Sequence, residues 1–267
     1  MLARWSAARA VAVVLGLSGA VAGTARAETW ELTFEAYGGG LPLATGVLHM
    51  NVDGGRRYDA RLDSASASWF NFVTRFQYQA EAAGTVSNPA VAPLRFRGER
   101  NARSKRDLTA LTYGNGTVAV HTEPPMNPEK ASLVPESDRR GSVDPLSAGI
   151  GVIVTAGGPV ACTGTYPVYD GRRRYDITMT PAGTTVLEPS KRRMAAGPAQ
   201  RCAVALRPVS GFQTDRDKPN AFFAEGKERT ATVWFVAVQG RTIPMQVEIE
   251  TDFGSFYVHT TAFKVLP

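Results

Sequence analysis

Three consecutive arginines, Arg172, Arg173 and Arg174, follow an Asp-Gly pair in the stretch VYDGRRRYDI. Guanidinium groups bind phosphates and carboxylates through paired hydrogen bonds, so this stretch is a candidate site for an anionic ligand. Asp-Gly between alternating residues also predicts a β-hairpin turn. Since alternate strand residues share a face, Arg172 and Arg174 are the pair that would act together if the stretch binds an anion. The interpretation that we favour is a solvated structural turn whose charges protect a sheet edge from aggregation, and anion binding is the alternative.

Two cysteines, Cys162 and Cys202, are candidates for a cross-link. There is no C-x-x-C motif, and the histidines His49, His121 and His259 are too scattered to suggest metal ligation. An even number of cysteines in an exported chain is typical of a structural disulfide. We therefore predict a Cys162–Cys202 bond, no metal site and no cofactor.

The sequence carries no recognisable hydrolase motif. Neither G-x-S-x-G nor H-E-x-x-H occurs, and the stretch around Ser210 lacks the glycine spacing of a nucleophile elbow. The three histidines each lie inside a predicted strand, where a lone histidine is more often solvated or satisfied than a general base. We therefore predict no catalytic residues, and an uncharacterised hydrolase ranks third among the hypotheses.

The N-terminal residues predict a secretory signal peptide. Arg4 provides positive charge, residues 10–23 are apolar, and residues 25–27 have the A-x-A form of a cleavage site. We expect residues 1–27 to be removed and residues 28–267 to form one periplasmic domain. No later stretch is apolar for long enough to span a membrane.

Most of the chain alternates apolar and polar residues, as half-buried strands do, beginning with residues 30–35. Asp144 before Pro145 has the form of a helix N-cap followed by proline in the first turn. The apolar run behind this pair predicts a short buried helix over about residues 145–156, ended by Gly157-Gly158. The expected fold is mainly β, with a single antiparallel curved sheet or open barrel wrapped around this helix.

Two stretches interrupt the strand pattern. Residues 122–141, rich in proline and mixed charge, predict a surface loop or flap. Residues 214–229 predict a second irregular segment that folds back onto the body of the domain.

Four aromatic residues admit two interpretations. A curved sheet with an apolar inner face can enclose a hydrophobic ligand, and aromatic side chains would then line the cavity or its rim. Equally, a β domain of this length buries aromatic residues in its core, and for Trp69 we favour core or rim packing. The candidates are Trp30, Trp69, Phe72 and Trp234.

Four stretches follow one another along the chain: TWELTFEAYGGGLPLATG, GSVDPLSA, CTGTYPVYDGRRRYDI and AQRCAVALRPVSGF. With the segments between them they resemble an exported bacterial family catalogued as domain of unknown function 3108. The resemblance implies an envelope-associated β protein and brings no agreed activity or catalytic residues. The expected architecture also resembles the periplasmic lipoprotein-carrier fold, a likeness that does not imply function.

These expectations lead to a binding protein as the first hypothesis. We expect a non-enzymatic periplasmic protein that binds a lipid, a lipoprotein or another envelope component. The formal net charge of +6 permits an anionic partner, and an exported protein is not expected to meet nucleic acid. The alternative is a structural or interaction protein with a fully packed interior, which would lack an apolar cavity beside the helix. The oligomeric state is left open.

Overall fold

The computed structural model describes residues 28–53, 57–73, 75–87, 90–131, 134–156, 162–212, 227–251 and 254–266. The predicted signal peptide, the Gly157-Gly158 pair and most of the irregular segment 214–229 lie outside this part of the chain. Among the described residues, no helix is both long and apolar enough to cross a membrane.

One antiparallel sheet of 13 strands forms the domain, in the order β7-β6-β5-β4-β3-β2-β1-β13-β12-β11-β10-β9-β8. β1 pairs with both β2 and β13, so the first and last described strands lie side by side inside the sheet. The edges β7 and β8 leave the sheet open, and the predicted mainly β, antiparallel fold is confirmed. The strands are β1 (Glu28–Gly38), β2 (Leu41–Asp53), β3 (Arg57–Ser66), β4 (Phe76–Ser87), β5 (Ala90–Ala102), β6 (Lys105–Gly114), β7 (Thr117–Glu123), β8 (Gly164–Tyr169), β9 (Arg174–Leu187), β10 (Gly197–Ser210), β11 (Arg229–Val238), β12 (Arg241–Thr251) and β13 (Gly254–Leu266).

The alternating pattern of the sequence separates the two faces of the sheet. In β2, Leu48 and Met50 are buried, whereas Asn51 on the opposite face is exposed. Tight turns connect neighbouring strands, and Asn115 (φ 51°) and Gly116 (φ 72°) adopt left-handed conformations between β6 and β7. Such positive φ values match the twist that a two-residue hairpin requires.

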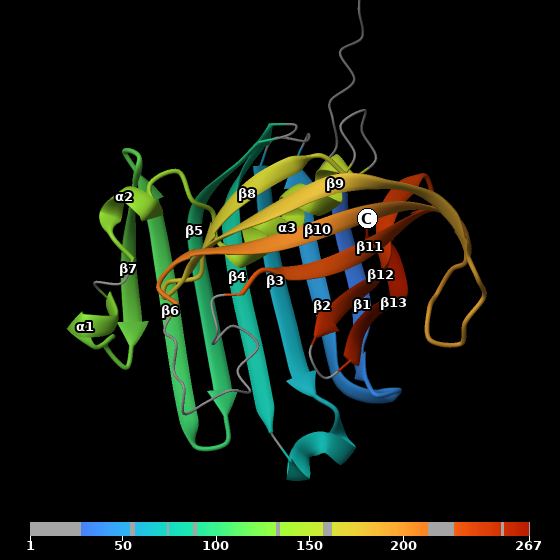
Figure 1. The fold of residues 1–267 in the computed structure, drawn as a ribbon, viewed down its shortest axis with the longest axis horizontal. Helices are drawn as coiled ribbons and strands as arrows, with labels where there is room; N and C mark the ends of the chain where they lie inside the picture. Colours follow the sequence, from blue (N-terminus) through green and yellow to red (C-terminus); the bar gives the residue numbers. More distant parts are fainter. Residues whose placement is uncertain are drawn as a thin grey trace, which may run out of the picture.

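The sheet curls so far that β8–β11 cross in front of β2–β5, and helix α3 (Pro145–Thr155) lies between the two parts (Figure 1). α3 contacts β4, β5, β8 and β12, which belong to both parts of the sheet. The Asp144 side chain accepts a hydrogen bond from the Ser147 backbone N–H, and Pro145 occupies the first turn. The buried helix predicted from this cap is therefore confirmed.

The predicted loop at residues 122–141 contains more regular structure than expected. Its first two residues belong to β7, and it includes the single-turn helices α1 (Pro128–Ala131) and α2 (Glu136–Arg139). Helices of one turn are too short to leave a period in the sequence, so the pattern gave no sign of them.

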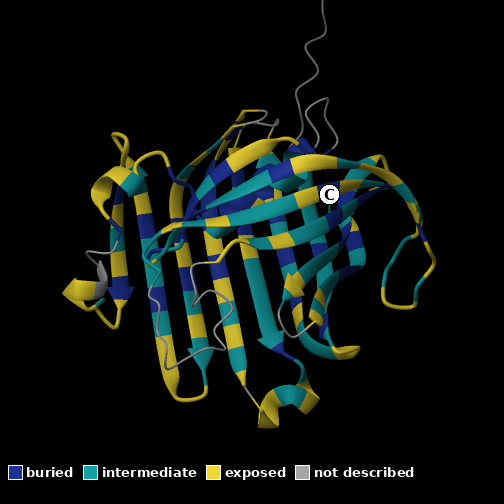
Figure 2. Ribbon diagram, in the orientation of Figure 1, coloured by how far each residue is buried: buried dark blue, intermediate teal, exposed yellow. Residues whose placement is uncertain are grey.

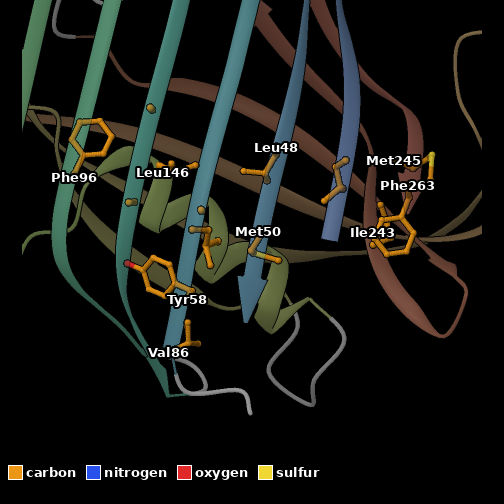
Figure 3. Packing of buried hydrophobic residues seen from close by; sticks show 14 of the residues in the cluster. Leu48, Met50, Tyr58, Val86, Phe96, Leu146, Ile243, Met245 and Phe263 are labelled. Carbon is orange, nitrogen blue, oxygen red and sulfur yellow. The ribbon is translucent and has the colours of Figure 1, made fainter. Parts of the chain in front are cut away.

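Side chains from both parts of the sheet pack around α3 to form the core (Figure 3). Met50, Ile150, Ile243 and Met245 have no exposed surface. Figure 2 shows the resulting alternation of buried and exposed residues along the strands. The helix thus occupies the centre of the described interior, where a carrier protein would hold an apolar ligand.

Two glycines of α3 provide a test of this packing. A Cβ at Gly149 would meet nothing within 4 Å, whereas a Cβ at Gly151 would lie 2.6 Å from Val91 Cγ2 and 2.7 Å from Tyr166 Cε1. Gly149→Ala is therefore expected to stabilise the fold by about 0.5–1 kcal/mol, because alanine restricts the unfolded chain and favours helix. Gly151→Ala is expected to destabilise it by about 1 kcal/mol or more, since the added methyl group overpacks the core. Urea unfolding of both variants measures the difference, and shifts of the same sign would contradict this packing.

Candidate functional site

A cleft of about 260 Å³ opens where the β8–β9 turn lies over the inner face of β4–β6. Arg172 and Arg173 contribute from the turn and Arg100 from β5. Asp107, Tyr78 and Phe96 complete the group of side chains that we call the arginine cleft. The cleft joins residues that are far apart in the sequence because the sheet folds over on itself.

The conformation of the β8–β9 turn places its arginines. The Asp170 carboxylate accepts hydrogen bonds from the backbone N–H groups of Arg172 (2.8 Å) and Arg173 (2.7 Å). Gly171 has φ 90°, and a Cβ there would lie 2.3 Å from Thr109 Cγ2. Only glycine tolerates both this conformation and this approach to β6. Burial raises the pKa of Asp170, and its hydrogen bonds and neighbouring arginines oppose that effect.

Asp107 holds two guanidinium groups at the cleft. Its carboxylate lies 2.6 Å from Arg100 Nη2 and 3.5 Å from Arg172 Nη2. The hydrogen bond from Arg100 and the charges of both arginines lower the pKa of Asp107, so this carboxylate is ionised at neutral pH. A guanidinium has several N–H donors, so an ion pair with Asp107 still leaves each arginine able to bind a second anion.

The structure does not bring Arg172 and Arg174 together. Arg174 Nη1 lies 2.7 Å from Asp176 Oδ1, and Arg174 Nε donates to the Asp138 carbonyl oxygen at 3.1 Å. The side chain is 11% exposed and does not line the cleft. β9 begins at Arg174, so Arg172 lies in the turn, where strand alternation does not apply. Arg100 and Arg173 take the place that the sequence assigned to Arg174.

The four candidate aromatic residues occupy two different environments. Trp30 and Trp234 are partly buried and pack against the core, with the Trp30 ring 5.8 Å from that of Phe263. Trp69 and Phe72 lie in the 3₁₀ segment η1 (Ser68–Phe72), where they are 41% and 81% exposed. Trp69 therefore lies neither in the core nor beside the arginine cleft.

Cys162 and Cys202 lie at disulfide-bonding distance, with a Cα–Cα separation of 5.2 Å, in agreement with the predicted bond. Both are buried, at 2% and 0% exposure. The bond connects β10 to the segment that leads into β8, the edge strand whose turn carries Arg172.

A buried chain of polar groups lies beside the helix cap. The Tyr58 hydroxyl donates to Ser147 Oγ (2.6 Å), and Ser147 Oγ donates to Asp144 Oδ2 (2.5 Å). All three side chains are at most 1% exposed, so no substrate reaches the serine. Burial raises the pKa of Asp144 to about 6, against the opposing effect of its hydrogen bonds from Ser147. The group caps α3 and ties it to β3.

The histidines show no arrangement typical of a catalytic base. His49 lies 3.6 Å from Glu31, and His121 lies 3.2 Å from Glu123, both at the surface. His259 is buried, and its ring lies 5.3 Å from that of Tyr37. Burial and the charges of Arg193 and Arg192 lower its pKa. Within the described ranges, no group of three or more His, Cys, Asp or Glu side chains could hold a metal ion.

Comparison with known proteins places these features in context. A family model described as "Protein of unknown function (DUF3108)" matches residues 30–261. A beta-barrel-like protein of domain of unknown function DUF1849 from Brucella abortus is similar in structure, with a TM-score of 0.52, 10% identity, and coverage of 90% of this chain and 99% of that chain. A hypothetical protein from Chlamydia trachomatis matches with a TM-score of 0.30, 10% identity, and coverage of 90% and 88%, too low to carry an argument. No curated protein matches the sequence. The structural likeness supports the fold alone.

Proposed function

We propose a function for this protein from the premise that its chain belongs to the family described as protein of unknown function DUF3108. The protein acts as an exported, periplasmic, non-enzymatic binding protein. Its ligand is an envelope lipid or lipoprotein that places an anionic headgroup in the arginine cleft. The observation that carries this proposal is the convergence of Arg100, Arg172 and Arg173 on one cleft.

The charge of the cleft favours an anionic ligand, and its size favours a headgroup over a whole lipid. Arg100 and Arg172 pair with Asp107, and the charges of Arg172 and Arg173 act on Asp170. Three arginines against two carboxylates leave the cleft with a net positive charge even when both carboxylates are ionised. Its volume of about 260 Å³ falls below the range of about 300 Å³ and above that is usual for pockets enclosing a drug-sized molecule. Tyr78 and Phe96 add aromatic surface beside the charges, which suits the boundary between a headgroup and an acyl chain.

The packed core argues for binding at this cleft instead of inside the sheet. α3 and the side chains around it fill the described interior, where Ile150 has no exposed surface. A lipid would therefore bind with its headgroup at the cleft and its acyl chains outside the described core. The competing hypothesis, a structural or interaction protein with a packed interior, shares this core but assigns no ligand to the arginines.

Export is supported by the cysteines. A buried disulfide persists in oxidising compartments and is rare in the cytosol. The predicted signal peptide at residues 1–27 points to the same location, since it would direct the chain to the secretion machinery.

Arg100→Gln combined with Arg172→Gln tests the cleft. Calorimetry would measure binding of water-soluble short-chain phosphatidylglycerol, with short-chain phosphatidylcholine as the neutral-headgroup comparison. We expect the wild type to prefer the anionic lipid and the double variant to bind it at least tenfold more weakly, because each lost charged hydrogen bond costs about 1.5–3 kcal/mol.

Arg95→Gln serves as the matched control. Arg95 is 73% exposed and pairs with Asp59 at 3.4 Å, away from the cleft, so its variant is expected to bind like the wild type. Equal affinity of the double variant and the wild type would refute the cleft as the site. A folded wild type that binds neither lipid would favour the structural or interaction hypothesis.

A further inference from the structure

We propose that a second surface, separate from the arginine cleft, docks the protein onto an anionic membrane. The surface lies at the end of the sheet where η1 follows β3 and where β1 turns into β2 (Figure 1). Its exposed apolar residues are Leu41, Trp69, Phe72, Val73 and Phe256, which we call the aromatic tip.

Hydrogen bonds and ring contacts hold the aromatic tip in place. Trp69 Nε1 donates to the Pro42 carbonyl oxygen (2.6 Å), and the Ala67 N–H donates to the Leu43 carbonyl oxygen (2.8 Å). The Trp69 ring lies 6.5 Å from that of Phe72. Segment η1 is therefore fixed against the β1–β2 hairpin, and its aromatic side chains are preorganised.

The fold does not use these side chains for its own core. None of the residues of η1 is buried, and Figure 2 shows this segment mostly in the colours of exposed and intermediate residues. Phe72 is 81% exposed, Leu41 54% and Val73 44%. A contiguous group of large apolar residues exposed on a folded domain marks an interaction surface.

Apolar side chains of β2 and β13 lie at the same end of the sheet, beside Gly38 of β1. A Cβ at Gly38 would lie 2.7 Å from Phe256 Cε1 and 2.8 Å from Leu43 Cδ1, so these two side chains meet across the glycine. Leu43 follows Pro42, whose carbonyl oxygen accepts the hydrogen bond from Trp69 Nε1. With the Ala67–Leu43 backbone hydrogen bond, these contacts bring η1 and the Phe256–Leu43 pair to the same end of the sheet.

Basic groups surround the aromatic tip, and carboxylates are absent from the segment that forms it. No Asp or Glu occurs between Asp63 and Glu81. Arg103 Nη2 donates to the Val73 carbonyl oxygen, and Arg192 Nη2 donates to the Gly40 carbonyl oxygen at 2.9 Å. Two further basic residues, Arg75 and Lys105, are exposed beside them.

This combination fits a membrane surface. Tryptophan and phenylalanine enter the boundary between headgroups and acyl chains, and nearby lysine and arginine are attracted to anionic lipids. The occupant that matches both the apolar centre and the basic surround is therefore a bilayer with negatively charged headgroups. Docking through the aromatic tip would keep the protein at the membrane from which its ligand comes.

The test measures partition of the full chain onto vesicles by flotation. Vesicles of phosphatidylcholine with phosphatidylglycerol are compared with vesicles of phosphatidylcholine alone. We expect the wild type to bind the anionic vesicles, with weaker binding at high salt because salt screens the basic groups. Leu41→Ser with Phe72→Ser is expected to lower the partition coefficient at least tenfold.

Leu94→Ser with Val186→Ser provides the matched control, since these residues are 60% and 63% exposed outside the aromatic tip. This control is expected to bind vesicles like the wild type. The emission of Trp69 should shift to the blue on vesicle binding, and Trp69→Phe should abolish that shift. Equal partition of the tip variant and the wild type would overturn the proposal, as would self-association through the tip without vesicle binding. The tip variant should also retain wild-type affinity for the short-chain lipid, which separates this proposal from that of the cleft.

Discussion

Loss of the Cys162–Cys202 bond is expected to lower the free energy of unfolding by about 4 kcal/mol. The bond closes a loop with a sequence separation of 40, and the chain-entropy estimate for a loop of this length gives that value. Both cysteines are buried, so the loop is anchored in the core and not at a flexible surface. The effect should reach the β8–β9 hairpin first, since β8 is an edge strand held by β9 on one side.

Urea unfolding with and without reductant measures this contribution. The double variant Cys162→Ser with Cys202→Ser should resemble the reduced wild type and should not respond to reductant. An unchanged unfolding midpoint of the wild type after verified reduction would show that the cross-link contributes nothing to stability.

Asp144→Asn is expected to remove a pH dependence of stability of about 3 kcal/mol. Burial raises the pKa of Asp144 from its ordinary 3.8 to about 6 in the folded protein. Between these values the folded state binds a proton that the unfolded state has lost, so this group makes stability fall as the pH rises from about 4 to about 6. The difference between the folded and unfolded pKa values of Asp144 corresponds to about 3 kcal/mol in the free energy of unfolding.

Asparagine keeps the oxygen that accepts the Ser147 N–H at 2.8 Å, and it is a favourable N-cap residue. The test compares the free energies of unfolding of wild type and Asp144→Asn at pH 4, 5, 6 and 7. As the pH rises, the free energy of unfolding of the wild type should fall relative to that of Asp144→Asn. Parallel curves for the two proteins would refute the raised pKa of Asp144. Asp144→Ala should be less stable than Asp144→Asn at every pH, because alanine also removes the cap.

Features encoded locally could be predicted from the sequence. Asp144 and Pro145 determine where α3 starts through contacts within one turn, so their types alone indicated the helix. The Asp-Gly pair before Arg172 likewise indicated the β8–β9 hairpin, because the turn is stabilised by the Asp170 side chain itself.

The arginine cleft could be predicted only in part. Arg172 was identified from its own turn, but Arg100 and Asp107 belong to strands distant in the sequence. They reach the turn because the sheet folds over α3, and no local pattern specifies the extent of that curl. The pairing of Arg172 with Arg174 assumed that the strand had already begun, whereas Asp170 and Gly171 bend the chain through Arg173.

The aromatic tip illustrates the same limit. The cluster Trp69 to Phe72 reads as core or rim in the sequence, since aromatic residues are usually buried. Its exposure depends on the position of η1 at the end of the sheet, where Trp69 is hydrogen-bonded to Pro42 of the β1–β2 hairpin. Segment η1 is short and has no period, so neither its conformation nor its position left a signal in the sequence.

Under the proposed function, the protein holds an anionic envelope component at the arginine cleft. Native mass spectrometry with lipid extraction, applied to the protein purified from the organism that makes it, would detect such a ligand. We expect an anionic lipid or lipoprotein to co-purify with the wild type and to be depleted from the Arg100→Gln, Arg172→Gln double variant, while Arg95→Gln retains it. A ligand-free wild type, or equal ligand occupancy in all three proteins, would contradict it.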